Sequence, residues 1–96
     1  PTTEKLSRGF RAAVPRGTIL LVGITPVPAK FAGARYPALR DEMLRRWGRW
    51  LEADGLLEAL PAVLPDELFT GATHLKPAAV PDFTTRVADA VRPHLR

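Results

Sequence analysis

The sequence contains no cysteine, which excludes disulfides, thiolate zinc sites and a cysteine nucleophile. This absence leaves the compartment open, because secreted proteins can also lack cysteine. Only one serine, Ser7, and two histidines, His74 and His94, are present among the 96 residues. The two histidines lie about five helical turns apart along the chain, so we expect no shared metal ion, and nothing in the sequence indicates a cofactor.

Long apolar runs are also missing. No stretch approaches the ~20 residues that a membrane helix needs, and no signal peptide is visible, so we predict no membrane segment in this chain. The chain begins with proline rather than methionine, as a processed chain or a fragment would. We therefore expect residues 1–96 to be either a single domain or the C-terminal half of a larger one.

A concentrated basic patch is absent although the net charge is +4. Eleven of the fourteen basic residues are arginines, and they are spread along the chain between acids, with no run longer than Arg45-Arg46. There is no Gly-aromatic RNA-binding signature and no zinc knuckle. We therefore predict that nucleic acid is not a partner.

The apolar pattern of the first half predicts a helix followed by a buried strand. Leu6, Phe10, Ala13 and Val14 form one stripe at helical spacing. Ser7 lies off that stripe without a nucleophile-elbow pattern, so we expect it to face solvent. The run Thr18–Thr25 is nearly all apolar, which is typical of a central strand in a parallel sheet, and Pro26 and Pro28 should end it.

Two further helices are predicted. The longer one begins at Pro37 and ends before Gly55, and we expect its arginines on the solvent side. Its expected buried stripe is Leu39, Met43, Leu44, Trp47, Trp50 and Leu51. The last helix either begins at Pro81 or kinks there, and it buries Phe83, Val87, Val91 and Leu95. Residues 55–60 are ambiguous between helix and strand. The alternation of helices and strands predicts an α/β fold with about two strands and three helices.

One histidine lies in a loop just before the last helix. The stretch Asp66-Glu67-Leu68-Phe69-Thr70-Gly71-Ala72-Thr73-His74-Leu75-Lys76-Pro77 is a loop by composition. The imidazole of His74 in this loop could accept a proton near neutral pH. Together with Phe83-Thr84, this block resembles the C-terminal block of the SGNH (GDSL-like) hydrolase and acyltransferase superfamily, closest to the alginate O-acetyltransferase-like branch. That block usually reads Asp-x-x-His-Leu-Asn.

The resemblance implies a role for His74 as the catalytic base. The Asp that orients the imidazole in the family falls on Gly71, so Asp66 and Asp82 are the candidate substitutes. The implied fold is a partial flavodoxin-like, three-layer arrangement of parallel strands with flanking helices. The implied substrate is an acyl ester or a cell-surface carbohydrate, in an extracytoplasmic or periplasmic setting. The family's Gly-Asp-Ser block and its oxyanion-hole Gly and Asn have no counterpart in these residues.

Three functions therefore remain open. The chain is a fragment or degenerate member of an SGNH-type esterase or O-acyltransferase that is inactive by itself, or a non-catalytic SGNH-like domain that binds a glycan or a protein. The third alternative, from another class, is a small basic binding domain unrelated to hydrolases, which an antiparallel sheet with Thr18–Thr25 at its edge would favour. A two-strand sheet leaves unpaired edges, so we also expect self-association.

Overall fold

The computed structural model describes residues 2–95, which form three α-helices and four very short strands. The strands pair in parallel, β1 with β3 and β2 with β4. In chain order the elements are α1 (Thr2–Ala13), β1 (Leu21–Val22), β2 (Val27–Pro28), α2 (Tyr36–Leu51), β3 (Gly55–Leu56), β4 (Val63–Leu64) and α3 (Val80–Val91). Single 3-10 turns occupy Ala29–Phe31, Asp66–Leu68, Pro77–Ala79 and Arg92–His94.

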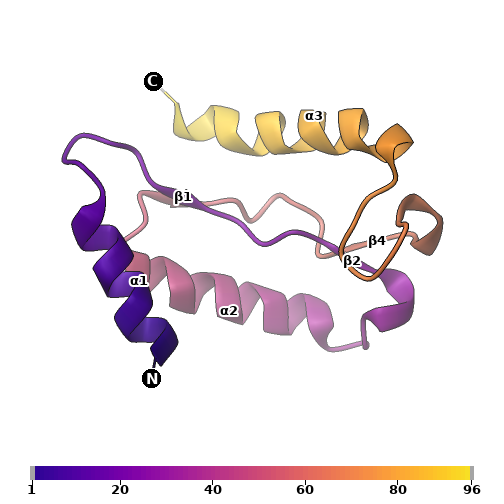
Figure 1. Ribbon diagram of the computed structural model, residues 1–96, viewed down its shortest axis with the longest axis horizontal. Coiled ribbons are helices and arrows are strands. Elements are labelled where there is room, and N and C mark those ends of the chain that lie inside the picture. Colours follow the sequence, from indigo (N-terminus) through magenta and orange to yellow (C-terminus); the bar gives the residue numbers. More distant parts are fainter. Residues whose placement is uncertain (1, 96) are drawn as a thin grey trace.

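The strands lie between α2 on one side and α3 on the other, as Figure 1 shows, and α1 packs against α2. Helices that alternate with parallel strands place the chain in the α/β class, as the sequence predicted. Because β1 pairs in parallel, the antiparallel sheet that would have favoured a small basic binding domain unrelated to hydrolases is not found. No helix within residues 2–95 is long and apolar enough to cross a membrane.

The prediction of one continuous central strand over Thr18–Thr25 was wrong. Only Leu21–Val22 forms ladder pairs there, and the prolines do not end the pairing, because Val27–Pro28 pairs again further on. The partner segment has two more residues between its two strands than the first segment has, and it accommodates them with a turn in which the Leu60 amide donates to the Leu57 carbonyl (3.3 Å). This extra length interrupts the ladder.

The buried face of α2 differs from the predicted one. Arg40, Leu44 and Gly48 are its buried residues, whereas Trp47 is only half-buried and Leu39 is 51% exposed. The shift follows from packing against β3. A Cβ atom placed on Gly48 would lie 2.5 Å from Leu56 Cδ2, so the glycine lets the helix lie against the Leu56 side chain without displacing its methyl group. Arg40, two turns earlier, is carried inward on the same face.

The apolar stripe of α1 is also oriented against expectation. Leu6 and Phe10 are 69% and 56% exposed, and the half-buried side chains are those of Glu4, Ser7 and Arg11. The expectation that Ser7 faces solvent was therefore wrong. The reason is that α1 packs chiefly on α2 through its polar face, and the described residues do not cover its apolar side.

The core lies between the strands and α3. Leu57, Leu60 and Ala90 are buried together, and Phe83, Val87 and Val91 pack on them, as the spacing of the last helix predicted. Leu95, the fourth residue of that stripe, is 59% exposed because α3 ends at Val91. The helix starts at Val80 rather than Pro81, which places the proline in the first turn, where its missing N–H breaks no bond.

Candidate functional site

The His74 loop is closed by backbone pairing, to which the Thr70 hydroxyl adds a hydrogen bond to the His74 carbonyl (3.3 Å). Phe69 and Leu75 form an isolated antiparallel bridge, and the Lys76 amide donates to the Leu68 carbonyl (2.8 Å). Inside this bridge the amide of Thr70 donates to the His74 carbonyl at 2.8 Å. The backbone of His74 is therefore held at the end of a short hairpin. In Figure 1 the hairpin belongs to the orange trace that leads from the turn after β4 to α3.

The imidazole of His74 is exposed and has no hydrogen-bond or ion-pair partner among residues 2–95. The ring is thus accessible, but nothing described fixes its tautomer. In a serine triad that task belongs to a carboxylate bonded to the second ring nitrogen.

Neither candidate carboxylate is paired with His74. Asp66 Oδ1 instead accepts a hydrogen bond from the backbone amide of Lys30 at 2.8 Å. Asp82 lies 3.6 Å from Arg86 Nε, and its side chain is 81% exposed. The structure therefore does not assemble the His–Asp pair that either substitution would require.

Asp66 has a structural role that the sequence did not reveal. It begins the 3-10 turn after β4, and Lys30 lies in the 3-10 turn after β2. The bond between them ties together the two loops that leave the carboxyl ends of the paired strands. This is the edge at which ligands bind in open α/β sheets.

A small apolar cavity of about 160 Å³ lies beside the hairpin. Its wall is built from β4, from the loop around Leu75 and from α3, with one carboxylate and one guanidinium contributed by α3. The lining residues are Leu64, Leu68, Leu75, Ala78, Ala79, Asp82, Phe83 and Arg86. His74 is next to Leu75 in sequence but is not among these residues, so the imidazole stands beside the cavity rather than in its wall.

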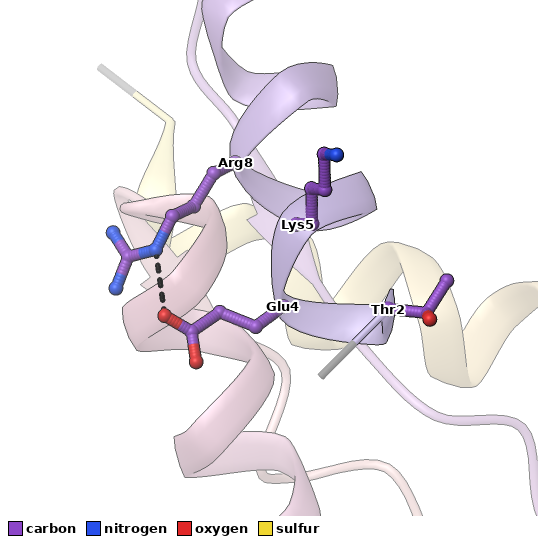
Figure 2. A pocket seen from close by; sticks show the side chains of 4 residues that line it. All are labelled: Thr2, Glu4, Lys5 and Arg8. Atoms are coloured by element: carbon purple, nitrogen blue, oxygen red, sulfur yellow. Dashed lines mark hydrogen bonds and ion pairs between the residues drawn. The ribbon is translucent and has the colours of Figure 1, made fainter.

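The lone serine is remote from this edge. Ser7 lies in α1, which Figure 1 shows at the end of the molecule opposite to the hairpin. A wide hollow on α1 is lined by Thr2, Glu4, Lys5 and Arg8, all from one helix. In Figure 2, Glu4 reaches Arg8 (3.0 Å), while Lys5 and Thr2 project to the other side of the helix. The four polar side chains do not point toward a common point, so we do not regard this hollow as a binding site.

The second histidine lies near the amino ends of β1 and β3, so the two imidazoles do not meet. A hollow of about 200 Å³ is lined there by Asp54 and His94, together with two apolar side chains. The His94 ring packs on Gly55, and Asp54 Oδ2 accepts a hydrogen bond from the Leu20 amide at 2.7 Å. Both residues therefore brace the start of the first strand pair. Within residues 2–95, no three His, Asp or Glu side chains are placed to hold a metal ion.

Comparisons with protein-family models, with curated proteins and with solved structures find no match for this chain. The carboxyl edge of the paired strands offers one accessible base, one small apolar cavity and an Asp82–Arg86 ion pair. This arrangement can accept a proton beside a bound apolar group. The Thr70 hydroxyl, in the same hairpin, donates to the His74 carbonyl (3.3 Å) rather than to the imidazole.

Proposed function

We propose that the chain is the base-bearing part of an SGNH-like ester hydrolase or O-acyltransferase, with His74 as general base, acting on an acyl ester of a cell-surface carbohydrate. One observation carries the proposal. An accessible imidazole is held on a backbone-closed hairpin between a parallel strand and the final helix, at the carboxyl edge of the strands. The three-layer arrangement of α2, strands and α3 supports a flavodoxin-like parent fold.

The imidazole has one task in this reaction. It takes the proton from a hydroxyl as the hydroxyl oxygen attacks the acyl carbonyl carbon, and it returns the proton to the alkoxide that leaves when the ester C–O bond breaks. The attacking hydroxyl must come from a serine of another segment or from the acceptor sugar, because Ser7 lies at the opposite end of the molecule.

The volume of the cavity beside the hairpin limits the size of the substrate group that can bind in it. Pockets for drug-sized ligands measure roughly 300–1,000 Å³, whereas this cavity holds about 160 Å³. It therefore suits a short acyl chain better than an oligosaccharide. We place the acyl group against Leu75 and Phe83, with the sugar outside, next to His74.

Ester turnover tests the requirement for a second component. We expect the chain alone to hydrolyse p-nitrophenyl acetate no faster than background, because Ser7 is remote and the Thr70 hydroxyl is bonded to the His74 carbonyl rather than to the imidazole. The wild type is compared with His74→Ala and Ser7→Ala. Turnover that disappears in both variants would establish a self-contained catalytic pair and refute the need for another component.

Gly71→Asp tests the position of His74 directly. A Cβ atom on Gly71 meets nothing within 4 Å, so the hairpin has room for a carboxylate at the position where the family has its Asp. We expect this carboxylate to hold the His74 ring in one tautomer, seen by nitrogen NMR of the imidazole. Gly33→Asp, at an equally open glycine in another loop, is the control and should leave the ring unchanged. If the two variants give the same ring spectrum, His74 is not placed as a base of this family.

The contacts of Asp66 and Asp82 favour a second function, the binding of a glycan without catalysis. Asp66 and Asp82 both have other partners, as they would in a non-catalytic SGNH-like domain that binds a glycan. NMR titration with an O-acetylated oligosaccharide, compared with the deacetylated sugar, tests this alternative. Shifts in the hairpin amides that require the acetyl group, without any turnover, would favour the binding function over the catalytic one.

A further inference from the structure

The chain is more open than a self-sufficient monomer of its size. Its accessible surface is 6721 Å², whereas a folded monomer of 10.5 kDa exposes about 5,400 Å². The radius of gyration is 14.6 Å, against roughly 12.5 Å for a compact chain of this length. The thinnest dimension is only 19 Å. Because the ladders are only two strands wide, each strand has one open edge.

Ladder geometry identifies which groups face the open edge of β1. The Val22 carbonyl accepts from the Leu57 amide at 2.8 Å, and the Leu20 carbonyl accepts from Asp54 at 2.7 Å. Backbone groups of successive residues alternate between the two sides of a strand. Ile19, Leu21 and Gly23 therefore point their amides and carbonyls away from β3.

The open edges of β1 and β2 differ in whether they can pair with another strand. At β2, the Val27 amide is used for β4, so Pro26 and Pro28 occupy the outward positions and offer no N–H to a new strand. The run Thr18–Thr25 has no proline and no charge among its residues. Edges without such residues are templates for pairing with another chain. Only the open edge of β1 can therefore pair with another chain.

We propose that a second copy of this chain occupies this edge, with residues 19–23 of the two copies pairing antiparallel about a two-fold axis. A strand that meets its own copy across a two-fold is necessarily antiparallel, and the contact closes at two subunits. The excess surface of roughly 1,300 Å² per chain, about 2,600 Å² for two, falls in the range of stable homodimer interfaces. Figure 1 shows α1 and β1 both on the near side of the molecule, and α1 carries the exposed Leu6 and Phe10, so we include this helix in the interface.

Amide hydrogen exchange at two protein concentrations tests the pairing. We expect the amides of Leu21 and Gly23 to become protected at least tenfold as concentration rises, while sedimentation shows a shift from monomer to dimer. The Leu57 amide, which is paired within one copy, is the internal reference and should stay protected throughout. A monomer at all concentrations, a species larger than a dimer, or protected edge amides in a monomer would each overturn the proposal.

Ile19→Pro separates edge pairing from folding. Its outward amide is removed, its side chain is already 47% exposed, and the bonds to β3 are left intact. We expect this variant to stay monomeric with an unchanged helical circular dichroism signal, and Ile19→Val, which keeps the amide, to dimerise like the wild type. If Ile19→Pro unfolds, Phe10→Lys on α1 provides the second test. Dimerisation that is unchanged in a folded Ile19→Pro and in Phe10→Lys would refute this interface.

Discussion

Arg40→Met is the most informative perturbation of the fold, because Arg40 is the one buried charged residue within residues 2–95. Arg40 is 6% exposed, and its Nε and Nη1 atoms are buried without a hydrogen-bond partner. Asp41 Oδ1 lies 3.1 Å from Nε, but the angles do not make this contact a hydrogen bond. By distance alone the guanidinium and the Asp41 carboxylate form an ion pair, but the Nε–H has no hydrogen-bond partner. We regard the Nε–H as unsatisfied, because a hydrogen bond weakens steeply when donor and acceptor are misaligned.

The expected sign follows from comparing three terms. Each buried N–H without a partner costs about 1–3 kcal/mol. The contact with Asp41, whose side chain is 48% exposed, offsets less than about 1 kcal/mol, since water screens it. Methionine keeps most of the aliphatic stem and fills an irregular space well. We therefore expect Arg40→Met to raise the free energy of unfolding by about 1–3 kcal/mol, in line with buried ion pairs replaced by apolar residues.

Urea unfolding followed by circular dichroism measures the change, with the m-value checked for constancy. Arg45→Met, on the exposed side of the same helix, is the matched control and should shift stability by no more than about 0.5 kcal/mol. A loss of more than about 1 kcal/mol in Arg40→Met alone would refute the reasoning. It would mean that the guanidinium has a partner in solution, such as a bound anion or a second chain.

Two further predictions concern packing and the site edge. Gly9→Ala, in an open stretch of α1, should stabilise the protein by about 0.5–1 kcal/mol in urea unfolding. Gly48→Ala should stabilise it less, because the new Cβ would lie 2.5 Å from Leu56 Cδ2 and this methyl group must move. Equal gains in both variants would show that Leu56 does not pack on α2. Asp66→Ala should destabilise the protein by about 1–2 kcal/mol and speed exchange of the Lys30 amide, and an unchanged Lys30 exchange rate would contradict the link between the two loops.

The sequence predicted which segments are helical better than it predicted which faces they bury. All three helices are present, because periodicity and proline position are local properties of the chain. The burial of Arg40 and the exposure of Leu6 were not predicted. Both depend on which element lies opposite, and a helical stripe identifies an apolar face without saying whether anything covers it. Likewise, Glu52 ends α2 in the left-handed conformation (φ 49°) although Gly55 was the expected stop, because a glycine signal is a preference rather than a requirement.

The candidate site shows the same division between local and tertiary information. The loop character of residues 69–77 follows from composition, but the Phe69–Leu75 bridge that closes it does not. Nearness in sequence made Asp66 and Asp82 candidates for His74, yet hydrogen bonding is directional, and Asp66 is held by the Lys30 amide 36 positions away along the chain. The second carboxylate oxygen of Asp66 could still accept a hydrogen bond, but Asp66 is anchored to Lys30 in the 3-10 turn after β4 and is not paired with the imidazole. Gly71 lies within the hairpin that carries His74 and has open space for a side chain, so an engineered carboxylate at Gly71 is a stronger test of the base than either native one.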